Sequence, residues 1–508
     1  MRFQLWPVAF LLCAPAFSQQ RLEVIVKDAE TNRMMPARVY LTDSKGELHV
    51  PPGAITYKKY KEEHFITDGR FRIDLPSGEY TLTVERGLEY VPRTVRLLNT
   101  TSPQHFDLAL KRWIPMNKLG WYSGDLHNHR KIDEMPQLLL AEDLNLAPTL
   151  TDWIWEDRPV SRPPDTTEAI RRVDATHVFS VLDKEVERLQ KGPGAIDLVG
   201  LKSAIPFEGY WLYPPNDHYC KLAREQGAYI DAEKILWRDS PAIAALCPMD
   251  FGGIVHNHFN RHGVEVETDK WGFGPKFRPE FGTPAGMPLW AMEVYYKFLN
   301  CGFRIAASAG SASAVKAAPL GYNRVYVKLD GPFSYEAWFR ALKQGRSFAT
   351  NGPVLLLTVN DRIPGDTIEA PSGSVRLNIK ANAETIGQLD RLEIVFKGRV
   401  VKTVSGGADS DELSAEVELP VNETGWVAAR AFERPGETIR FAQTSPVYVK
   451  VGDDRGIVRD DAKFFIDWID IQMEHYRREP GFRSPEHREA MLDYFNRARE
   501  VYKKLAAQ

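Results

Sequence analysis

The chain has 508 residues, more than one hydrophobic core usually serves, and this length predicts about two to four domains. With 43% hydrophobic and 26% charged residues it is typical of a folded globular protein, which excludes disordered and fibrous classes. The net charge of −3, without a long basic run, argues against nucleic acid as a main partner.

Residues 1–18 have the pattern of a secretory signal peptide. Arg2 precedes the apolar run LWPVAFLLCAPAF, which is too short to span a bilayer, and Ala16-Phe17-Ser18 fits the small-x-small cleavage rule. Pro7 disfavours a long anchor helix, and no later segment reaches about 18 uninterrupted apolar residues. We therefore expect export to the periplasm or the extracellular space with no stable membrane anchor. A buried N-terminal helix is the alternative.

Residues 19–112 are predicted to form an antiparallel β-sandwich. The segments LEVIV, ARVYL, FRIDL and YTLTV alternate apolar and polar residues, and turn signals such as DSKGE and LPSGEY separate them. The module resembles transthyretin-like or carboxypeptidase-regulatory-like domains, which implies a structural or substrate-presenting role.

Residues 113–350 change pattern and predict an α/β domain with a largely parallel sheet or barrel. Helical stretches, PQLLLAEDLN, HVFSVLDKEVERLQKG and NDHYCKLAREQG, alternate with the short apolar runs AIDLVGL and FGGIVHNHF.

Three cysteines follow the predicted cleavage site, Cys220, Cys247 and Cys301. Three widely spaced cysteines favour buried thiols, and the alternative is that two of them form a disulfide.

Residues 351–451 return to period two and predict a second β-sandwich, and residues 452–508 predict a helical tail. In the tail, Phe465, Trp468, Ile469 and Tyr476 share one helical face. Ser484-Pro485 begins a second helix whose aromatic stripe we expect to pack on the preceding domain.

Two histidine clusters in the central segment predict a metal site. Asp125, His127 and His129 in GDLHNH alternate, so a strand presents both imidazoles to one side. His256 and His258 repeat the His-Asn-His pattern after the apolar run at 252–255. Ligands from several strands often meet at the carboxyl ends of those strands in α/β barrels. The alternative is that the second pair forms hydrogen bonds in a loop and never meets the first.

The segment GDLHNH also resembles the first motif of the PHP superfamily (polymerase and histidinol phosphatase type), in its exported CehA/McbA branch. The segments AEDLNLAPTLTDW, LNCGFRIAASAGSASA and YEAWFRALKQGRSFATNGPVLLLTVNDRIPGD resemble later parts of that family, so the similarity runs from about residue 120 to 451. It implies a distorted β/α barrel that binds two or three metals and hydrolyses an ester, carbamate, amide or phosphoester.

Several ligand positions depart from the family pattern. Asp152-Trp153 stands where the family has Asp-His, and Ala312 and Ala314 replace an Asp and a His. Glu185 falls near a bridging Glu. Asp231 and Glu233 stand near another His of the family. The resemblance therefore implies a reduced site, with metal ligands drawn from Asp125, His127, His129, Glu185, His256 and His258, for one Zn, Mn or Fe ion or for none.

Three functions are compatible with these residues. The first is a secreted metal-dependent hydrolase with Glu233 or Asp152 as general base. The second is a catalytically silent PHP-like protein that binds a glycan or a cell-wall fragment. The third is a metal-free hydrolase that uses Ser311 or Ser313 with a histidine. We expect a small or carbohydrate-like substrate, because aromatic residues and two cations could line a cleft. They are the segment FEGYWLYPPNDHY, Trp271, Trp290, Tyr295 and Tyr296, with Arg261 and Lys297.

Overall fold

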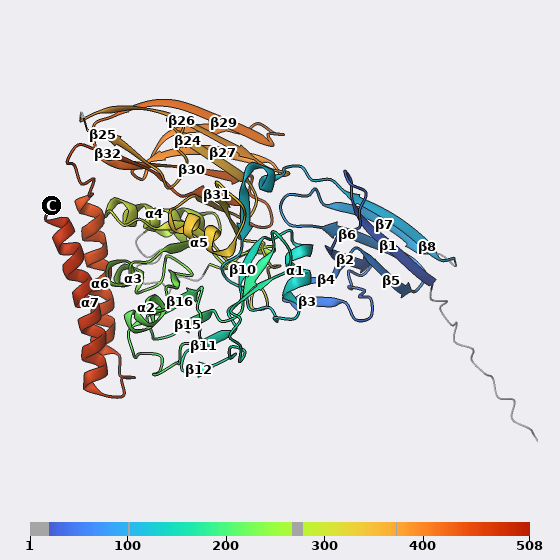
Figure 1. Cartoon of the computed structure of the whole chain (residues 1–508), viewed down its shortest axis with the longest axis horizontal. Helices are drawn as coiled ribbons and strands as arrows, with labels where there is room; N and C mark the ends of the chain where they lie inside the picture. The colour runs from blue at the N-terminus through green and yellow to red at the C-terminus, as the bar shows by residue number, and fades with distance from the viewer. Residues whose placement is uncertain (1–19, 100–101, 267–277, 372) are drawn as a thin grey trace, which may run out of the picture.

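The computed structural model describes residues 20–99, 102–266, 278–371 and 373–508. It is a multidomain mixed α/β structure with an N-terminal pair of sheets, a central region, a C-terminal pair of sheets and a final pair of helices (Figure 1). The predicted signal peptide lies outside the described residues. No helix in the described ranges has the length and apolar character needed to cross a membrane.

The N-terminal region is the predicted sandwich of two sheets around one core. The small sheet has the order β5-β1-β8 and the larger one β3-β4-β2-β6-β7. Every pairing is antiparallel except β1 with β8, which is parallel. The strands are β1 (Gln20–Asp28), β2 (Ala37–Asp43), β3 (Ile55–Lys59), β4 (Glu62–Thr67), β5 (Arg70–Leu75), β6 (Gly78–Glu85), β7 (Arg93–Asn99) and β8 (Gln104–Leu110).

The strands of the central region are divided between two sheets. One contains β9 (Trp121–Gly124), β10 (Leu146–Pro148), β13 (Ile170–Arg172), β14 (Val178–Ser180), β22 (Arg324–Lys328) and β23 (Ser347–Thr350). The other contains β11 (Asp152–Trp155), β12 (Arg158–Pro159), β15 (Lys184–Arg188), β16 (Gly194–Val199), β17 (Tyr229–Asp231), β18 (Phe251–Val255) and β21 (Ala306–Ala309). The short pair β19 (Phe259–Asn260) and β20 (Gly263–Val264) stands apart.

The pairing within these sheets is mixed, and a closed barrel is not confirmed. Parallel contacts join β9 with β10, β11 with β15, and β17 with β18 and then β21, whereas β15, β16 and β17 are antiparallel neighbours. The prediction of a largely parallel sheet was therefore wrong. The helices between the strands are α1 (Met135–Ala141), α2 (Asn216–Glu225), α3 (Ser240–Leu246), α4 (Gly286–Asn300) and α5 (Tyr335–Lys343).

The segment 177–192 was predicted as a helix and forms strands β14 and β15 instead. The helical interpretation assumed that its charged residues face water, but Lys184 and Arg188 are at most 1% exposed. Lys184 pairs with Asp152, and Arg188 donates to the carbonyls of Tyr210 and Pro214. Gly192 and Gly194 flank the turn into β16, so β15 and β16 form a hairpin.

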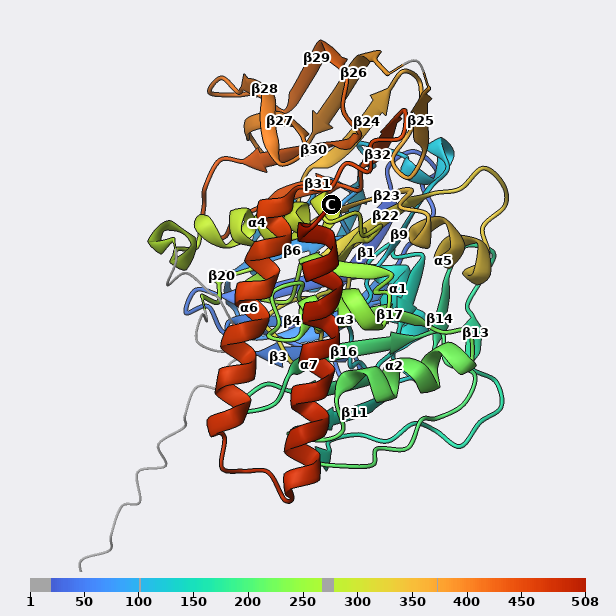
Figure 2. The same ribbon diagram turned by 90° about the vertical axis from the view of Figure 1, so that its left-hand side faces the viewer.

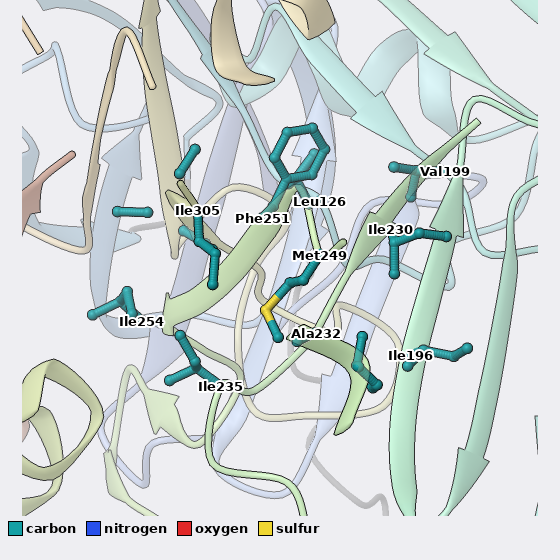
Figure 3. Packing of buried hydrophobic residues seen from close by; sticks show 14 of the residues in the cluster. Leu126, Ile196, Val199, Ile230, Ala232, Ile235, Met249, Phe251, Ile254 and Ile305 are labelled. Atoms are coloured by element: carbon teal, nitrogen blue, oxygen red, sulfur yellow. The ribbon is translucent and has the colours of Figure 1, made fainter. Parts of the chain in front are cut away.

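The second central sheet has one apolar and one acidic face. Register places Val186 beside Ile196 and Leu198 beside Ile230, on the face that enters the hydrophobic core. Figure 3 shows part of this core, including Ile196, Ile230 and Phe251. The intervening residues of β15, β16 and β17 carry carboxylates. Because successive side chains alternate, these carboxylates point to the other face.

The C-terminal region is the predicted second sandwich. One sheet contains β24 (Val354–Val359), β26 (Val375–Glu384) and β29 (Glu412–Val421). The other contains β25 (Thr367–Ala370), β27 (Leu389–Phe396), β28 (Arg399–Ser405), β30 (Gly425–Glu433), β31 (Phe441–Thr444) and β32 (Val447–Val451). Strand β31 pairs with β23, so this sheet continues into the first central sheet as one twelve-stranded sheet.

The tail consists of α6 (Arg459–Arg478) and α7 (Pro485–Ala506), which lie side by side (Figure 2). Ser484 caps α7 through its side chain, which accepts from the amide of His487. The aromatic stripe packs on α3 and α4 of the central region rather than on the sandwich that precedes it in the chain. Trp468, for example, stacks with Trp290 at a centroid distance of 6.3 Å.

This packing gives a test of the tail. We expect Trp468→Ala to lower the free energy of unfolding by about 3–5 kcal/mol, because the fully buried ring leaves a cavity. Ile471→Ala on the same helix is the control; its side chain is 43% exposed, and a change within about 0.5 kcal/mol is expected. Urea unfolding followed by circular dichroism measures both, and equal losses would contradict this packing.

Candidate metal centre

The first histidine pair lies in the loop that leaves β9 and is held by the segment 310–314. His129 donates its amide to the carbonyl of Ser313 at 2.9 Å, and the carbonyl of His127 accepts the amide of Ala312 at 2.7 Å. A Cβ on Gly310 would lie 2.4 Å from the Cβ of His127, so this close approach requires glycine. The two segments thus fix the backbone that presents both imidazoles.

Three ligand atoms from two sheets meet at this point. The Nε2 atoms of His127 and His129 are 3.0 Å apart, and Glu185 Oε2 lies 3.1 Å from that of His129 and 3.7 Å from that of His127. Ligand atoms bound tetrahedrally to zinc at roughly 2.0–2.1 Å lie about 3.3–3.4 Å from one another. His127, His129 and Glu185 therefore form a group that could hold a metal ion.

The chemical state of these side chains suits a cation. Glu185 is 2% exposed and its Oε2 accepts no hydrogen bond within the described residues. Burial raises the pKa of Glu185 to about 7, with His127 opposing that rise, and burial lowers the pKa of His129 to about 4. A neutral imidazole with a carboxylate that lacks a hydrogen-bonding partner is a donor set that fits a divalent ion.

Asp125, predicted as a ligand, directs its carboxylate to backbone amides. Its Oδ1 accepts the amides of His127 at 3.1 Å and Ser311 at 3.0 Å, and its Oδ2 accepts the amide of Gly321 at 2.7 Å. The carboxylate is fully buried. Asp125 thereby ties the His127 loop to the segment 310–321, and its hydrogen bonds are directed to amides rather than to the ligand group.

Glu233, predicted as a general base, is saturated with donors. It accepts from Trp237 Nε1 at 2.8 Å, from Asn257 Nδ2 at 2.8 Å and from the ammonium of Lys234, and it lies 3.2 Å from His127 Nδ1. Despite burial, these partners, Lys234 first, hold its pKa well below the usual value. A carboxylate on the second ring nitrogen orients a metal-binding histidine, and that is the role that this geometry supports.

The second histidine segment reaches the same carboxylate. Asn257, which lies between His256 and His258, supplies the 2.8 Å hydrogen bond to Glu233. The ring of His256 accepts the amide of His258 at 3.3 Å, and His258 Nδ1 lies 3.0 Å from the carbonyl of Glu265. The two His-Asn-His segments therefore converge on Glu233, while His256 and His258 lie outside the three-residue ligand group.

Asp152, the other predicted base, forms an ion pair with Lys184 at 2.7 Å. The neighbouring Trp153 is in register with Glu185 and its ring lies 4.6 Å from that of His129. Because consecutive side chains of β11 point to opposite faces, Asp152 points away from the ligand group. The helical assignment of 177–192 could not predict this ion pair, because only strand β15 places Lys184 beside Asp152 of β11.

Three residues near the ligands were not identified from the sequence. Asp197 lies directly across from Glu185 in the sheet, and its Oδ2 is 3.5 Å from His127 Nδ1. Glu187 is half-buried on the same strand and accepts from Trp153 Nε1 at 3.1 Å. Lys234 is 3% exposed. The signal that identifies them is the alternation in KEVER, AIDLV and YIDAEK once these segments are treated as strands.

Within the described residues, the predicted aromatic set does not gather at one cleft. Trp290, Tyr295 and Tyr296 are at most 4% exposed and belong to the core around α4. In the 207–219 loop, Tyr213 stacks on His487 of α7 with centroids 3.9 Å apart. Of the two predicted cations, Lys297 pairs with Asp461 and lines a cavity with Tyr296, whereas Arg261 pairs with Glu85. Trp271 lies outside the described residues.

The cysteines are buried thiols without disulfides, in agreement with the favoured prediction for Cys220, Cys247 and Cys301.

Comparisons with protein-family models, curated proteins and solved structures found no match. The resemblance to the CehA/McbA branch therefore remains an interpretation of sequence motifs, and the candidate site is defined by its own geometry.

The ligand group predicts metal binding that depends on the first histidine pair. We expect the chain without residues 1–18 to carry about one divalent ion per molecule, by elemental analysis of protein purified without chelator. A His127→Ala/His129→Ala variant should lose it, because one carboxylate alone binds weakly. The control, His105→Ala, changes a histidine whose side chain is 52% exposed, and should keep the ion. Equal metal content in both variants would contradict the assignment.

Proposed function

We propose that the protein is an exported metal-dependent hydrolase of the CehA/McbA type with a mononuclear site. The observation that carries this proposal is the convergence of three ligand atoms, from His127, His129 and Glu185, at separations of 3.0–3.7 Å. Catalytic zinc sites commonly use three protein ligands and keep one position open. The motif resemblance supports the same class, with an ester, carbamate, amide or phosphoester as substrate.

The surroundings of the ligands suit hydrolysis. A divalent ion bound here would lower the pKa of a water molecule toward about 7 and polarise the oxygen of the substrate's carbonyl or phosphoryl group. His127 is held by Glu233 through Nδ1, so Nε2 faces the ligand position. Trp153 and Glu187 are the partly exposed residues beside the ligands, and we expect a substrate to reach the ligand group past them.

Glu187 is the proton acceptor that this arrangement favours. It lies two residues from Glu185 on β15, so both carboxylates leave the same face of the sheet. Trp153 Nε1 binds its Oε2 at 3.1 Å and leaves the second oxygen to accept a proton from water. The indole thus orients the carboxylate, and it also packs on His129 and can contact an apolar part of a substrate.

The experiment is a hydrolysis screen of nitrophenyl esters, carbamates and phosphoesters with the metal-loaded protein. We expect turnover that chelator abolishes and that zinc or manganese restores. Glu187→Gln should lower kcat about 10²–10⁴-fold while metal content stays unchanged, because it removes a proton acceptor and no ligand. Glu168→Gln, an exposed glutamate, is the matched control and should retain full kcat.

Other outcomes would redirect the assignment. Turnover that survives complete metal removal would favour a side-chain hydrolase over the proposal. Stoichiometric binding of a glycan without turnover would favour a binding protein. Loss of metal in Glu187→Gln would show that this carboxylate acts as a ligand rather than as a base.

A further inference from the structure

The acidic face of the second central sheet carries more carboxylates than the ligand group uses. Register aligns Glu185 with Asp197 and Asp197 with Asp231, and Glu233 follows two residues later. These four residues are at most 5% exposed. Buried carboxylates of this density require positive charge or protons, since each uncompensated ion is costly.

Asp197 shows that the compensation is incomplete around the ligand group. The residue is fully buried, and neither of its oxygens accepts a hydrogen bond within the described residues. Its Oδ2 lies 3.5 Å from His127 Nδ1, and that nitrogen also faces Glu233 at 3.2 Å. Both oxygens therefore keep lone pairs that a cation can bind.

Lys234 brings a positive charge to Glu233. Its ammonium contacts both oxygens of Glu233 and lies 4.7 Å from the centre of the Trp237 ring. The ammonium therefore lies beside the carboxylate that shares His127 Nδ1 with Asp197.

The position of Lys234 is fixed by its backbone. A Cβ on Gly253 would lie 1.9 Å from the carbonyl oxygen of Glu233, which shows how closely β18 passes this segment. Trp237 also donates to Glu233 at 2.8 Å. These contacts fix the backbone from which the Lys234 side chain starts and the carboxylate that it binds.

We propose that the ammonium of Lys234 is a built-in cation that fills a second cation position beside Glu233 and Asp197, and so limits the site to one metal ion. This inference rests on the proposed metal site and assigns a role to a residue outside its ligand group. It explains why the acidic face, which has more carboxylates than the ligand group uses, would bind only one exchangeable metal ion. The lysine is part of the chain, so a chelator cannot remove it.

The test counts metal ions in lysine variants after incubation with excess manganese or zinc and removal of free metal. We expect Lys234→Gln to rise from about one ion per chain to about two, because the lost ammonium leaves Glu233 and Asp197 for a second ion. Adding Asp197→Asn to Lys234→Gln should return the count to one. Lys184→Gln is the matched control: it removes another buried lysine, paired with Asp152 on the opposite face, and should leave the count unchanged.

The outcomes separate this inference from the proposed function. One ion in wild type and one in folded Lys234→Gln would overturn the inference and leave the hydrolase proposal intact. No ion in wild type but one in Lys234→Gln would overturn the hydrolase proposal and support the cation role of Lys234. No ion in either protein would overturn both.

A second measurement covers a variant that does not fold without metal. Lys234→Gln and Lys234→Met would then be refolded with and without manganese, with circular dichroism as the readout. Refolding only with manganese, with two ions retained, supports the inference because the metal replaces the missing charge. Failure of both variants in both media, while Lys184→Gln folds, would overturn it, since the lysine would then have a role that a cation cannot fill.

Discussion

The structure of the site depends on the burial of carboxylates between two sheets. Glu185, Asp197, Asp231 and Glu233 are nearly inaccessible to water, and the hydrogen bonds that each receives differ widely. Glu233 receives donors from three residues and contacts His127, and Asp231 receives the hydroxyl of Ser308. Asp197 receives no hydrogen bond from the part of the chain that the structure describes. Since an uncompensated buried charge costs several kcal/mol, cations and protons must complete this part of the fold.

The N-terminal sandwich is part of the same construction rather than an appended module. The hydroxyl of Tyr57 accepts the amide of Ala314 at 3.1 Å and donates to the carbonyl of Lys316, so it holds the segment that braces His127 and His129. The guanidinium of Arg130, one residue beyond His129, lies 4.9 Å from the centre of the Tyr57 ring. Ala312 and Ala314 have φ of 48° and 84°, a left-handed backbone that side chains disfavour and that surrounding contacts must impose.

The alternation of apolar and polar residues was enough to predict both sandwiches. For the tail, apolar residues at helical spacing and the Ser484-Pro485 start were enough to predict two helices. The central sheets were harder, because the rule that charged residues face water fails for Lys184, Glu185 and Arg188. Their partners come from β11 and from the loop before α2, which no local pattern reveals. Once 177–192 was assigned to a helix, the alternation of Glu185 with Glu187 and its alignment with Asp197 could not be seen.

Composition and spacing identify donor atoms, and hydrogen bonding decides what each donor does. The sequence named His127, His129 and Glu185 along with Asp125, Glu233 and Asp152, and nothing in their spacing separates the two sets. In the structure, Asp125 accepts hydrogen bonds from three amides and Asp152 pairs with a lysine. Glu185 Oε2, in contrast, accepts no hydrogen bond from the described residues. A metal ligand needs a lone pair that no proton donor already occupies. In this chain the difference between a structural acid and a ligand is therefore set by residues more than 20 positions away, such as Ser311 and Gly321 for Asp125 and Lys184 for Asp152.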